Sequence, residues 1–391
     1  MRASVSVPRG RRAVQSRPRP RAEGRSSASR AWRGASLLAP LAALLLGCSA
    51  PTAGAPAVKA PSAPALAAPT AASAPAAPTA ATSAPAASAP AAPVALTVGA
   101  VNPNANIWTI VVGIEKGFFE QAGTKVELTF TGSTANTTQQ VVAGAIDLGN
   151  GSMDNYVRAA EAGAPIVAVA GEQTMPTYGL LGQPDVATVA DLRGKLLILG
   201  GIKDPTLFFL HQMLRPNGLA DDDYDLTFAG GTSDRFAALQ AGAVAAALLT
   251  QPFDFAAERL GYRRLVSQWD YPIDYQFIAY GVRRDWAETH EDALVRFLRG
   301  FGAAHRWLHD PRHRDEAIAL LSQAVKLQPE DASATYDLLI TRLKMLAPDG
   351  QIAEKDVRGV LDSLVALGDM ASPPPPVSKY LDNRYVEAAR R

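Results

Sequence analysis

Cysteine and histidine are scarce in this 391-residue chain, which holds one cysteine, Cys48, and five histidines. A single thiol excludes any disulfide within the chain. Three histidines, His305, His309 and His313, recur every four residues, a spacing that would align metal ligands on one helical face. Because Pro311 should interrupt that helix, we expect a solvated face there, with no metal and no cofactor.

Signatures of common enzyme classes are also missing. The sequence contains no HExxH, no P-loop and no GxSxG nucleophile elbow. Hydrophobic residues make up 48% of the chain, which is ample for the buried cores of two or three domains. We therefore expect a globular protein that is not an enzyme.

Positive charge is concentrated at the start of the chain. Residues 1–33 hold ten arginines and one glutamate, so the remaining residues carry 28 basic and 36 acidic side chains, a net charge of −8. Nucleic-acid binding depends on lysine and arginine neutralising phosphates. The acidic remainder therefore argues against a nucleic-acid partner.

The arginine-rich start precedes the apolar run ASLLAPLAALLLG, which ends at Cys48. This order is typical of a secretory signal, and the run is too short to span a bilayer as a mature helix. LLGC is similar to the lipobox of bacterial lipoproteins, which implies a signal peptide over 1–47 and a lipid on Cys48. An ordinary signal with an incidental cysteine is the alternative.

Residues 48–93 are almost wholly alanine, proline, serine and threonine after the cysteine, with Lys59 as the one charge. A segment without large apolar side chains cannot offset the entropy of ordering, so we expect a disordered tether. Its frequent prolines argue against the alternative of an alanine-rich helix.

Three strand-to-helix turns follow within about sixty residues, which is the pattern of an α/β sheet. The expected strands are Val94–Val101, Lys125–Phe130 and Ala145–Asn150, each followed by a polar turn and a helix. The first of these helices should cover residues 107–123. Strands joined by helices imply a parallel sheet, whose ligands bind outside the carboxyl ends of the strands.

A second set of elements repeats the design. After one more strand of the first half, Ile166–Glu172, the repeated strands are expected at Leu196–Gly201 and around residues 225–249. Both halves contain a helix–AGA–strand unit, QQVVAGAIDLGN and AALQAGAVAAALLT. The chain should cross to a second lobe after Gln173 and return near Tyr280. Helices from residue 290 onward should pack on the first lobe.

These motifs carry a family resemblance. The order of GIEKGFFEQAG, TGST, GAIDLGNGS, DLRGK and ALLTQPF resembles the solute-binding proteins of ABC importers, and within them the group for sulfonates, taurine, nitrate and thiamine-type pyrimidines. The resemblance covers roughly residues 94–343. It implies a type II periplasmic-binding fold: two Rossmann-like lobes, a hinge and a C-terminal helical extension. Lobe 1 would span 94–178 and 280–391, and lobe 2 would span 179–279.

The polar turns supply the candidate ligand contacts. They are Asn106, Trp108, Thr131, Gly132, Ser133, Thr134, Ser152, Met153, Asp154, Lys203, Asp204, Pro205, Thr250, Gln251 and Tyr275. Plain structural roles compete for several of them. Trp108 could be a core aromatic, Ser133 and Thr134 could cap a helix, Asp154 could pair with Arg158, and Lys203 could be a solvated charge.

The resemblance also implies partners and location. The protein would be a monomer in the cell envelope, lipid-anchored through Cys48, that delivers a small polar or heteroaromatic molecule to an ABC permease and its ATPase. The related pyrimidine synthases use a cysteine-rich iron site, which a chain with Cys48 alone cannot build. An enzyme or ligand sensor on the same fold is the alternative.

Overall fold

Two five-stranded sheets organise the part of the chain that the computed structural model describes, residues 92–391. These residues belong to one compact unit. The predicted signal segment, Cys48 and nearly all of the predicted tether lie outside them. Within residues 92–391, no helix is long and apolar enough to cross a membrane.

The first sheet has the strand order β2-β1-β3-β10-β4. Its strands are β1 (Val94–Ala100), β2 (Thr124–Phe130), β3 (Leu148–Ser152), β4 (Ile166–Gln173) and β10 (Ile278–Arg283). Strand β1 is parallel to β2 and β3, whereas β10 is antiparallel to β3 and β4. Every residue of β3 and β4 is buried, as expected for strands covered by helices on both faces.

The second sheet repeats this arrangement in the order β7-β6-β8-β5-β9. Its strands are β5 (Gly179–Gly182), β6 (Leu196–Leu199), β7 (Asp225–Phe228), β8 (Ala246–Leu249) and β9 (Arg263–Ser267). Strands β6, β7 and β8 are parallel, and β5 is antiparallel to β8 and β9. The repeat confirms the two α/β lobes, which we name lobe 1 and lobe 2 after their sheets.

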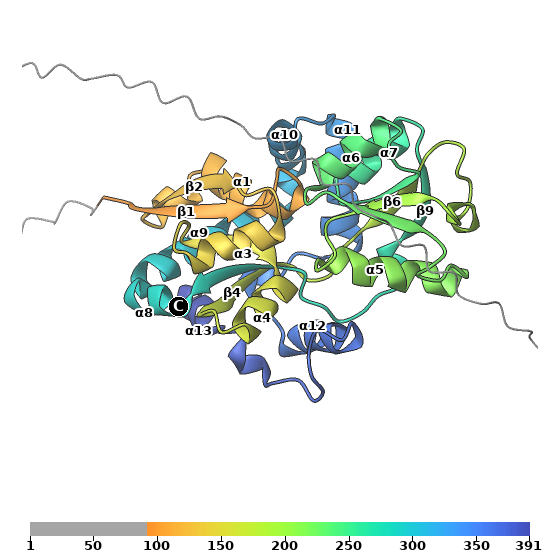
Figure 1. The fold of residues 1–391 in the computed structure, drawn as a ribbon. Helices are drawn as coiled ribbons and strands as arrows, with labels where there is room; N and C mark the ends of the chain where they lie inside the picture. The colour runs from red at the N-terminus through yellow and green to blue at the C-terminus, as the bar shows by residue number, and fades with distance from the viewer. Residues whose placement is uncertain (1–91) are drawn as a thin grey trace, which may run out of the picture. The chain divides into compact units, whose positions relative to one another are not determined.

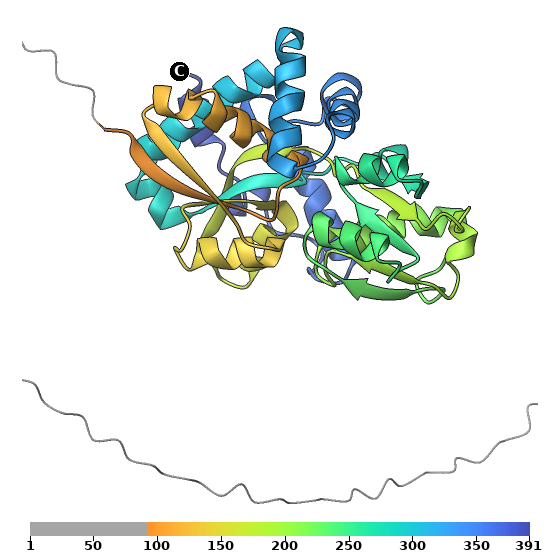
Figure 2. The same cartoon turned by 90° about the horizontal axis from the view of Figure 1, so that it is seen from above.

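Neither sheet is purely parallel, in contrast to the simplest expectation from alternating strands and helices. The reversed strand in each sheet, β10 or β5, is the one that follows a crossing from the other lobe. Such a strand enters its sheet without the right-handed helical crossover that makes neighbouring strands parallel. In Figures 1 and 2 the teal strand β10 returns to the orange and yellow lobe 1 from the green lobe 2.

The helices of lobe 1 are α1 (Trp108–Glu115), α2 (Phe118–Gln121), α3 (Thr134–Val142) and α4 (Met153–Glu161). The single helix expected over 107–123 is divided into α1 and α2. Gly117 adopts a left-handed conformation with φ of 67° between them, which ends the first helix. Lobe 2 contains α5 (Pro205–Leu214), α6 (Thr232–Gln240) and α7 (Phe253–Arg259).

The C-terminal part is helical, as predicted. Its helices are α8 (Arg284–Thr289), α9 (Glu291–His309), α10 (Arg314–Val325), α11 (Pro329–Tyr336), α12 (Glu354–Ala366) and α13 (Arg384–Ala389), with a π-helical segment at Asp337–Arg342. Helix α9 ends before Pro311, so His313 lies in a separate 3-10 turn and the three histidines do not share one helix. Short 3-10 turns also occur at Ala105–Ile107, Val189–Leu192, Arg215–Asn217, Gln268–Asp270, Pro311–His313, Pro348–Gly350 and Val377–Lys379.

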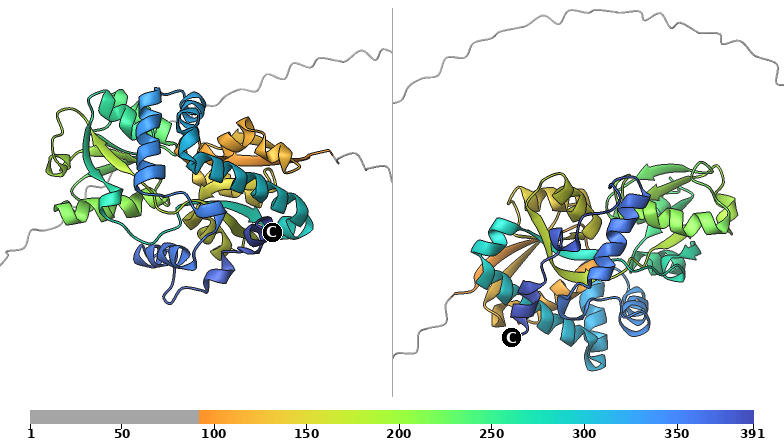
Figure 3. Two further views of the ribbon diagram at one scale, coloured as in Figure 1. Left: turned by 180° about the vertical axis from the view of Figure 1, so that it is seen from behind. Right: turned by 90° about the horizontal axis from the view of Figure 1, so that it is seen from below.

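The C-terminal helices contact both lobes. Helix α9 packs on α1 and α2, and α12 packs on α4, all in lobe 1. Helix α11 contacts α7 of lobe 2, and α10 contacts α1. Figure 3 shows these blue helices from behind and from below. The extension therefore also touches lobe 2, which the sequence did not predict.

Two segments connect the sheets, residues 174–178 after β4 and residues 268–277 before β10. They are bonded to each other at both ends. The amide of Phe277 donates to the carbonyl of Gln173 at 3.1 Å, and the amide of Gln268 donates to the carbonyl of Tyr178 at 2.8 Å. The two crossings thus form one paired connection between the lobes.

Candidate functional site

A small polar cavity lies where the two lobes meet, at the carboxyl ends of their parallel strands. Its volume is about 40 Å³. Both lobes and both crossings contribute to its wall, which contains Asn102, Asn104, Asn106, Thr134, Tyr178, Asp204, Pro205, Thr206, Gly230, Thr232, Arg235, Thr250, Phe277 and Ile278. This position follows the rule that α/β sheets bind ligands beyond the strand ends.

Three asparagines form the turn after β1. The side chain of Asn104 caps the following 3-10 turn by accepting from the amide of Asn106 at 2.7 Å, and its own amide donates to Asn102 at 3.1 Å. Asn102 in turn donates across the lobe boundary to the hydroxyl of Ser233 at 3.0 Å. The side chain of Asn106 lines the cavity without a hydrogen-bond partner among the described residues.

The turn after β2 begins α3. Ser133 is the N-cap, and its hydroxyl accepts from the amide of Asn136 at 3.2 Å. The hydroxyl of Thr131 is hydrogen-bonded to the hydroxyl of Thr137 at 2.6 Å, and Thr131 does not line the cavity. Thr134 does line the cavity, and its hydroxyl donates to Asp204 of lobe 2 at 3.2 Å. The structure thus gives Ser133 its capping role and gives Thr134 a place in the cavity.

The turn after β3 lies beside the cavity. Met153 is buried in the core, and the hydroxyl of Ser152 accepts from Asn155 at 2.9 Å. Asp154 is only 1% exposed, and its carboxylate oxygens form no well-aligned hydrogen bond among residues 92–391, although the Ser152 hydroxyl and the Asn155 amide lie close enough to lower its pKa somewhat. Its nearest cation is the Nε of Arg158, at 3.8 Å. Burial, followed by the negative charge of Asp204, raises the pKa of Asp154 to about 7.

Lobe 2 contributes the turn between β6 and α5. Asp204 caps α5 by accepting from the amide of Thr206 at 3.0 Å. Pro205 occupies the first turn of the helix, where a backbone N–H would have no partner within the helix, so the missing N–H of proline costs no hydrogen bond. Both residues line the cavity. Lys203 is exposed and does not line it, which favours a solvated charge.

The turn after β8 holds one cavity residue and one structural residue. The Thr250 hydroxyl is buried, lines the cavity and has no partner. The Gln251 side chain donates to the Thr177 carbonyl at 2.6 Å and to Asp254 at 2.7 Å, so its amide is already satisfied by protein atoms. The backbone carbonyl of Gln251 accepts a hydrogen bond from the backbone amide of Ala105 in lobe 1 at 3.1 Å.

Two candidate aromatics lie in the core and not in the cavity wall. Trp108 is fully buried, donates from its indole nitrogen to the carbonyl of Ala317 at 2.9 Å, and packs edge-on against Tyr336. Tyr275 is 2% exposed and packs edge-on against Phe209 at 4.9 Å. For Trp108 the structure favours the core role that the sequence left open.

Arg235 is the cavity residue that sequence reasoning missed. It is 3% exposed, and its guanidinium donates to the carbonyls of Leu248 at 2.7 Å and Gly230 at 2.9 Å. Within residues 92–391 it forms no ion pair, and its burial lowers its pKa. A cation near the N-terminus of a helix opposes the helix dipole. The position of Arg235 near the start of α6 was therefore the sequence feature that could have marked it as a binding residue.

Tyr178 and Phe277, from the two crossings, were also missed. Their rings pack edge-on with centroids 5.5 Å apart, and both line the cavity. The Tyr178 hydroxyl has no hydrogen-bond partner in the described part of the chain, and burial raises its pKa well above 10. The cavity therefore contains a cation, free hydroxyl donors, a free amide, one acid and two aromatic edges.

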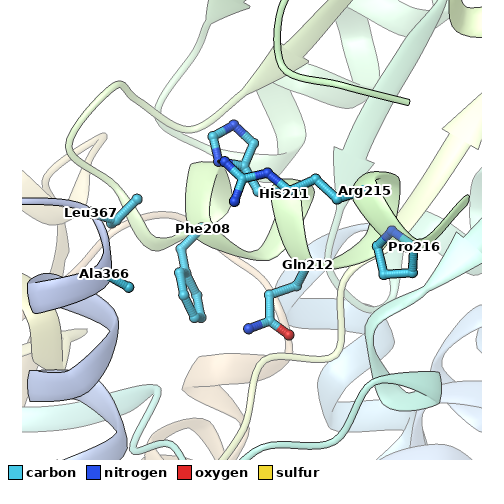
Figure 4. Close-up of a pocket in the computed structure, with 7 residues that line it drawn as sticks. All are labelled: Phe208, His211, Gln212, Arg215, Pro216, Ala366 and Leu367. Atoms are coloured by element: carbon cyan, nitrogen blue, oxygen red, sulfur yellow. The ribbon is translucent and has the colours of Figure 1, made fainter. Parts of the chain in front are cut away.

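Larger hollows occur elsewhere. A groove between α5 and α12 comprises adjoining cavities of about 340 and 480 Å³, which share Phe208, Gln212 and Ala366. Figure 4 shows side chains of α5 opposite Ala366, the last residue of α12 (Glu354–Ala366), and the following Leu367. Unlike the interlobe cavity, this groove has no buried charge in its wall. No group of histidine, cysteine and acidic residues among 92–391 could hold a metal ion.

The chain belongs to the NMT1/THI5-like family, whose model matches residues 104–313. No curated protein matches the chain at a significant level.

Solved structures share the two-lobed fold. The periplasmic aliphatic sulphonate binding protein SsuA from Escherichia coli is 25% identical with a TM-score of 0.52, over 63% of this chain and 84% of its own. The periplasmic nitrate-binding protein NrtA from Synechocystis PCC 6803 is 15% identical with a TM-score of 0.64, over 76% and 89%. The desulfurization enzyme DSZB is 13% identical with a TM-score of 0.56, over 76% and 99%.

Proposed function

We propose that this chain is the extracytoplasmic solute-binding protein of an ABC importer and that it captures a small polar molecule with an anionic group between its two lobes. Family membership and similarity to sulfonate- and nitrate-binding proteins support the transport role. Sulfonate, nitrate, carboxylate and acidic heteroaromatic compounds are the candidate ligands.

The observation that carries the anionic group is the position of Arg235. A buried guanidinium that donates only to carbonyl oxygens, with Asp204 and Asp234 near but beyond ion-pair distance, has little of the counter-charge that normally offsets its desolvation. A ligand anion in the cavity would supply that charge. The hydroxyls of Thr250 and Tyr178, which have no hydrogen-bond partner among residues 92–391, would donate to the same group.

Ligand entry requires the lobes to separate. A cavity of about 40 Å³ is far below the roughly 300–1,000 Å³ of typical ligand sites, and residues of both lobes line it. The hydrogen bonds from Asn102 to Ser233 and from Thr134 to Asp204 join the lobes at its edge. We propose that the paired crossings act as a hinge, and that a permease recognises the closed shape.

Calorimetry on the purified protein with sulfonates, nitrate and carboxylates tests the proposal. Thr250→Val keeps the side-chain shape and removes a hydroxyl that no protein atom uses, so the fold should persist. A hydrogen bond to a charged group contributes about 1.5–3 kcal/mol, so we expect roughly 10- to 150-fold weaker anion binding. Arg235→Gln should abolish it. If wild-type protein binds none of these anions, the proposal fails.

The lipid anchor and its location are the second part of the proposal. The LLGC segment and the alanine- and proline-rich segment after it support attachment through Cys48, with the protein a monomer facing the periplasm or cell exterior. Cys48→Ser should release the protein from membranes or block its processing. A variant that fractionates and migrates like wild type would contradict the anchor.

An enzymatic or sensor role is the competing interpretation. The likeness to DSZB, at 13% identity, shows the shared fold alone. No contact in the cavity favours catalysis over binding. Turnover of a bound compound by the purified protein, without permease or ATPase, would establish the enzymatic alternative.

A further inference from the structure

We propose that the C-terminal helical extension contains a second binding site, which takes an apolar monocarboxylate such as a medium-chain fatty acid or an aromatic acid. The site is a cavity of about 560 Å³ whose wall includes residues of α9, α10 and α11. Helices α10 and α11 pack on each other, as Figure 1 shows. The cavity shares no described lining residue with the interlobe cavity, so this inference does not depend on the proposed transport function.

The size and the walls of the cavity fit the apolar part of such a ligand. Its volume lies within the roughly 300–1,000 Å³ of typical ligand sites. Pro311, Tyr336, Ile340 and Leu346 line it, and the last three belong to one buried core cluster that holds them in place. Apolar surface that faces a cavity favours an apolar occupant, because the occupant removes both surfaces from water.

Two histidines of α9 complete the wall as uncharged rings. The sequence led us to expect a solvated face here, but His305 is only 6% exposed, and its ring stacks on that of His309 with centroids 4.0 Å apart. The Nδ1 of His309 lies 2.8 Å from the carbonyl of His305, which can only accept, so this nitrogen carries a proton. Burial lowers the pKa of His305 to about 3 and lowers the pKa of His309 below 6.5. Neither ring therefore attracts an anion into the interior at pH 7.

The positive charge of the site lies at its edge. Of the two cations that line it, Arg314 is paired with both carboxylate oxygens of Asp337 at 3.0 Å and lies over the ring of Tyr336. Lys344 is exposed and forms no ion pair within residues 92–391. No acidic residue is among the described lining residues. An anionic group at the edge would therefore meet Lys344 while the rest of the ligand occupies the apolar interior.

The backbone that presents these side chains is irregular. The amide of Leu343 donates to the carbonyl of Leu338 at 2.9 Å, five residues earlier, within the π-helical segment Asp337–Arg342. Lys344 follows in a left-handed conformation with φ of 51°, which is uncommon for a residue other than glycine. Both π-helical turns and such costly conformations occur often at functional sites. Here they coincide in the segment that contributes Ile340, Thr341 and Lys344 to the cavity.

Matched ligands test the site. Octanoate and octanamide share an alkyl chain, and phenylacetate and phenylacetamide share a ring, so the members of each pair differ in having a carboxylate or an uncharged amide. Calorimetry on the purified protein at pH 7 should show one-to-one binding of at least one acid, about two- to fivefold tighter than its amide, as expected for one exposed ion pair. Acetate, which has no apolar part, should not displace the acid.

Lys344→Gln should remove the preference for the carboxylate. The acid should then bind about two- to fivefold more weakly than it binds wild type, whereas the affinity of the amide should stay the same. Arg342→Gln is the matched control. Arg342 is an exposed cation two residues away, without an ion pair within residues 92–391, and it does not line the cavity. Both affinities should stay at wild-type values in this variant.

Thr341→Phe should block the cavity itself. Thr341 lines it from an exposed position, and its side chain makes no hydrogen bond within residues 92–391, so the fold should persist with a melting temperature near that of wild type. The larger ring should weaken binding of the acid and of its amide tenfold or more. Arg235→Gln, which removes the cation of the interlobe cavity, should still bind the acid as wild type does.

Four outcomes would overturn the proposal. No binding of either acid to the wild-type protein, or wild-type affinity in a folded Thr341→Phe variant, would exclude a site in this cavity. Equal affinity for acid and amide, or an unchanged preference in Lys344→Gln, would exclude a carboxylate at Lys344. Loss of acid binding in Arg235→Gln would place the acid between the lobes. Displacement of the acid by acetate would show that the apolar part of the ligand is not recognised.

Discussion

A Cβ atom at Gly230 would lie 2.6 Å from the carbonyl oxygen of Gly132 and 2.8 Å from the Cβ of Ser133. Gly230 precedes α6 in lobe 2, whereas Gly132 and Ser133 precede α3 in lobe 1. The lobes therefore meet backbone to backbone at this point, and only glycine permits the approach.

Gly230→Ala should accordingly hinder closure. The added methyl group meets a carbonyl oxygen that cannot swing aside, and such overpacking costs about 1–3 kcal/mol, or roughly 5- to 150-fold in ligand affinity. The empty protein should unfold at nearly its wild-type temperature, because an open arrangement removes the clash. Small-angle scattering should show a larger radius of gyration for the variant at saturating ligand.

Gly201→Ala is the matched control. It lies in the same lobe, but its added Cβ would meet only the Cβ of Asp204, at an ordinary 3.4 Å. Affinity and scattering should stay at wild-type values in this variant. Wild-type affinity in Gly230→Ala would show that the lobes need not close to this contact when ligand binds.

The ion pair between Arg259 and Asp331 predicts an effect on the attachment of lobe 2 to the C-terminal helices. Arg259 of α7 donates to both carboxylate oxygens of Asp331 on α11, at 3.0 and 2.8 Å, and Asp331 is 2% exposed. Asp331→Asn removes the negative charge and replaces one acceptor oxygen with an NH₂ donor, so one contact with Arg259 is lost and the other becomes neutral, which weakens the link between lobe 2 and the C-terminal helices. We expect a lower Tm and faster hydrogen exchange in α7 and α11. Asp310→Asn, whose partner Arg312 is exposed, should change neither.

Substitution of Trp108 should lower the stability of the fold without lowering ligand affinity. Deleting this fully buried ring should cost about 3–5 kcal/mol of unfolding free energy in Trp108→Ala, from lost burial and the cavity left behind. Trp108→Phe keeps most of the volume but leaves the Ala317 carbonyl without its donor, at a cost of about 1–3 kcal/mol.

Ligand affinity of the folded Trp108 variants should equal that of wild type at a temperature well below their melting points. Denaturant unfolding and calorimetry measure the two quantities separately. A variant that kept its stability yet bound ligand tenfold more weakly would place the indole in the ligand site.

The sequence predicted the architecture because strand, turn and helix patterns are local. The polar turns after the parallel strands located Thr134, Asp204 and Thr250 near the cavity, since parallel strands end at a common edge. The reversed strands β5 and β10 were not predicted as such, because strand direction after a lobe crossing depends on the path of the whole chain.

The remaining site residues depend on packing. The sequence around Trp108 does not show which side of α1 faces the core. Arg235 lies in α6, for which the sequence predicted a helix start but not which side chains face the cavity. Tyr178 and Phe277 lie on crossings with no regular periodicity. Their roles follow from the apposition of two lobes, which no single stretch of sequence contains.

Asp154 predicts how stability depends on pH. Its pKa is raised from 3.8 to about 7 in the folded protein, chiefly by burial. Between these values the folded state holds a proton that the unfolded state has released, so the stability of the folded state falls as pH rises from about 4 to 7 and then levels. A difference of about three pH units corresponds to roughly 4 kcal/mol as an upper limit.

Asp154→Asn cannot ionise, so its stability relative to wild type should increase across that interval. The two proteins should be nearly equal in unfolding free energy at pH 4, and the variant should be more stable by about 2–4 kcal/mol at pH 8, after allowance for an amide without partners. Urea unfolding at pH 4 to 8 measures the difference. Burial also raises the pKa of Glu172 to about 7, but this contribution is common to both proteins and cancels. The unfolding free energy of Glu172→Gln, relative to wild type, should therefore also rise between pH 4 and 7. If the unfolding free energies of wild type and Asp154→Asn changed in parallel with pH, Asp154 would not ionise as a buried carboxylate over this interval.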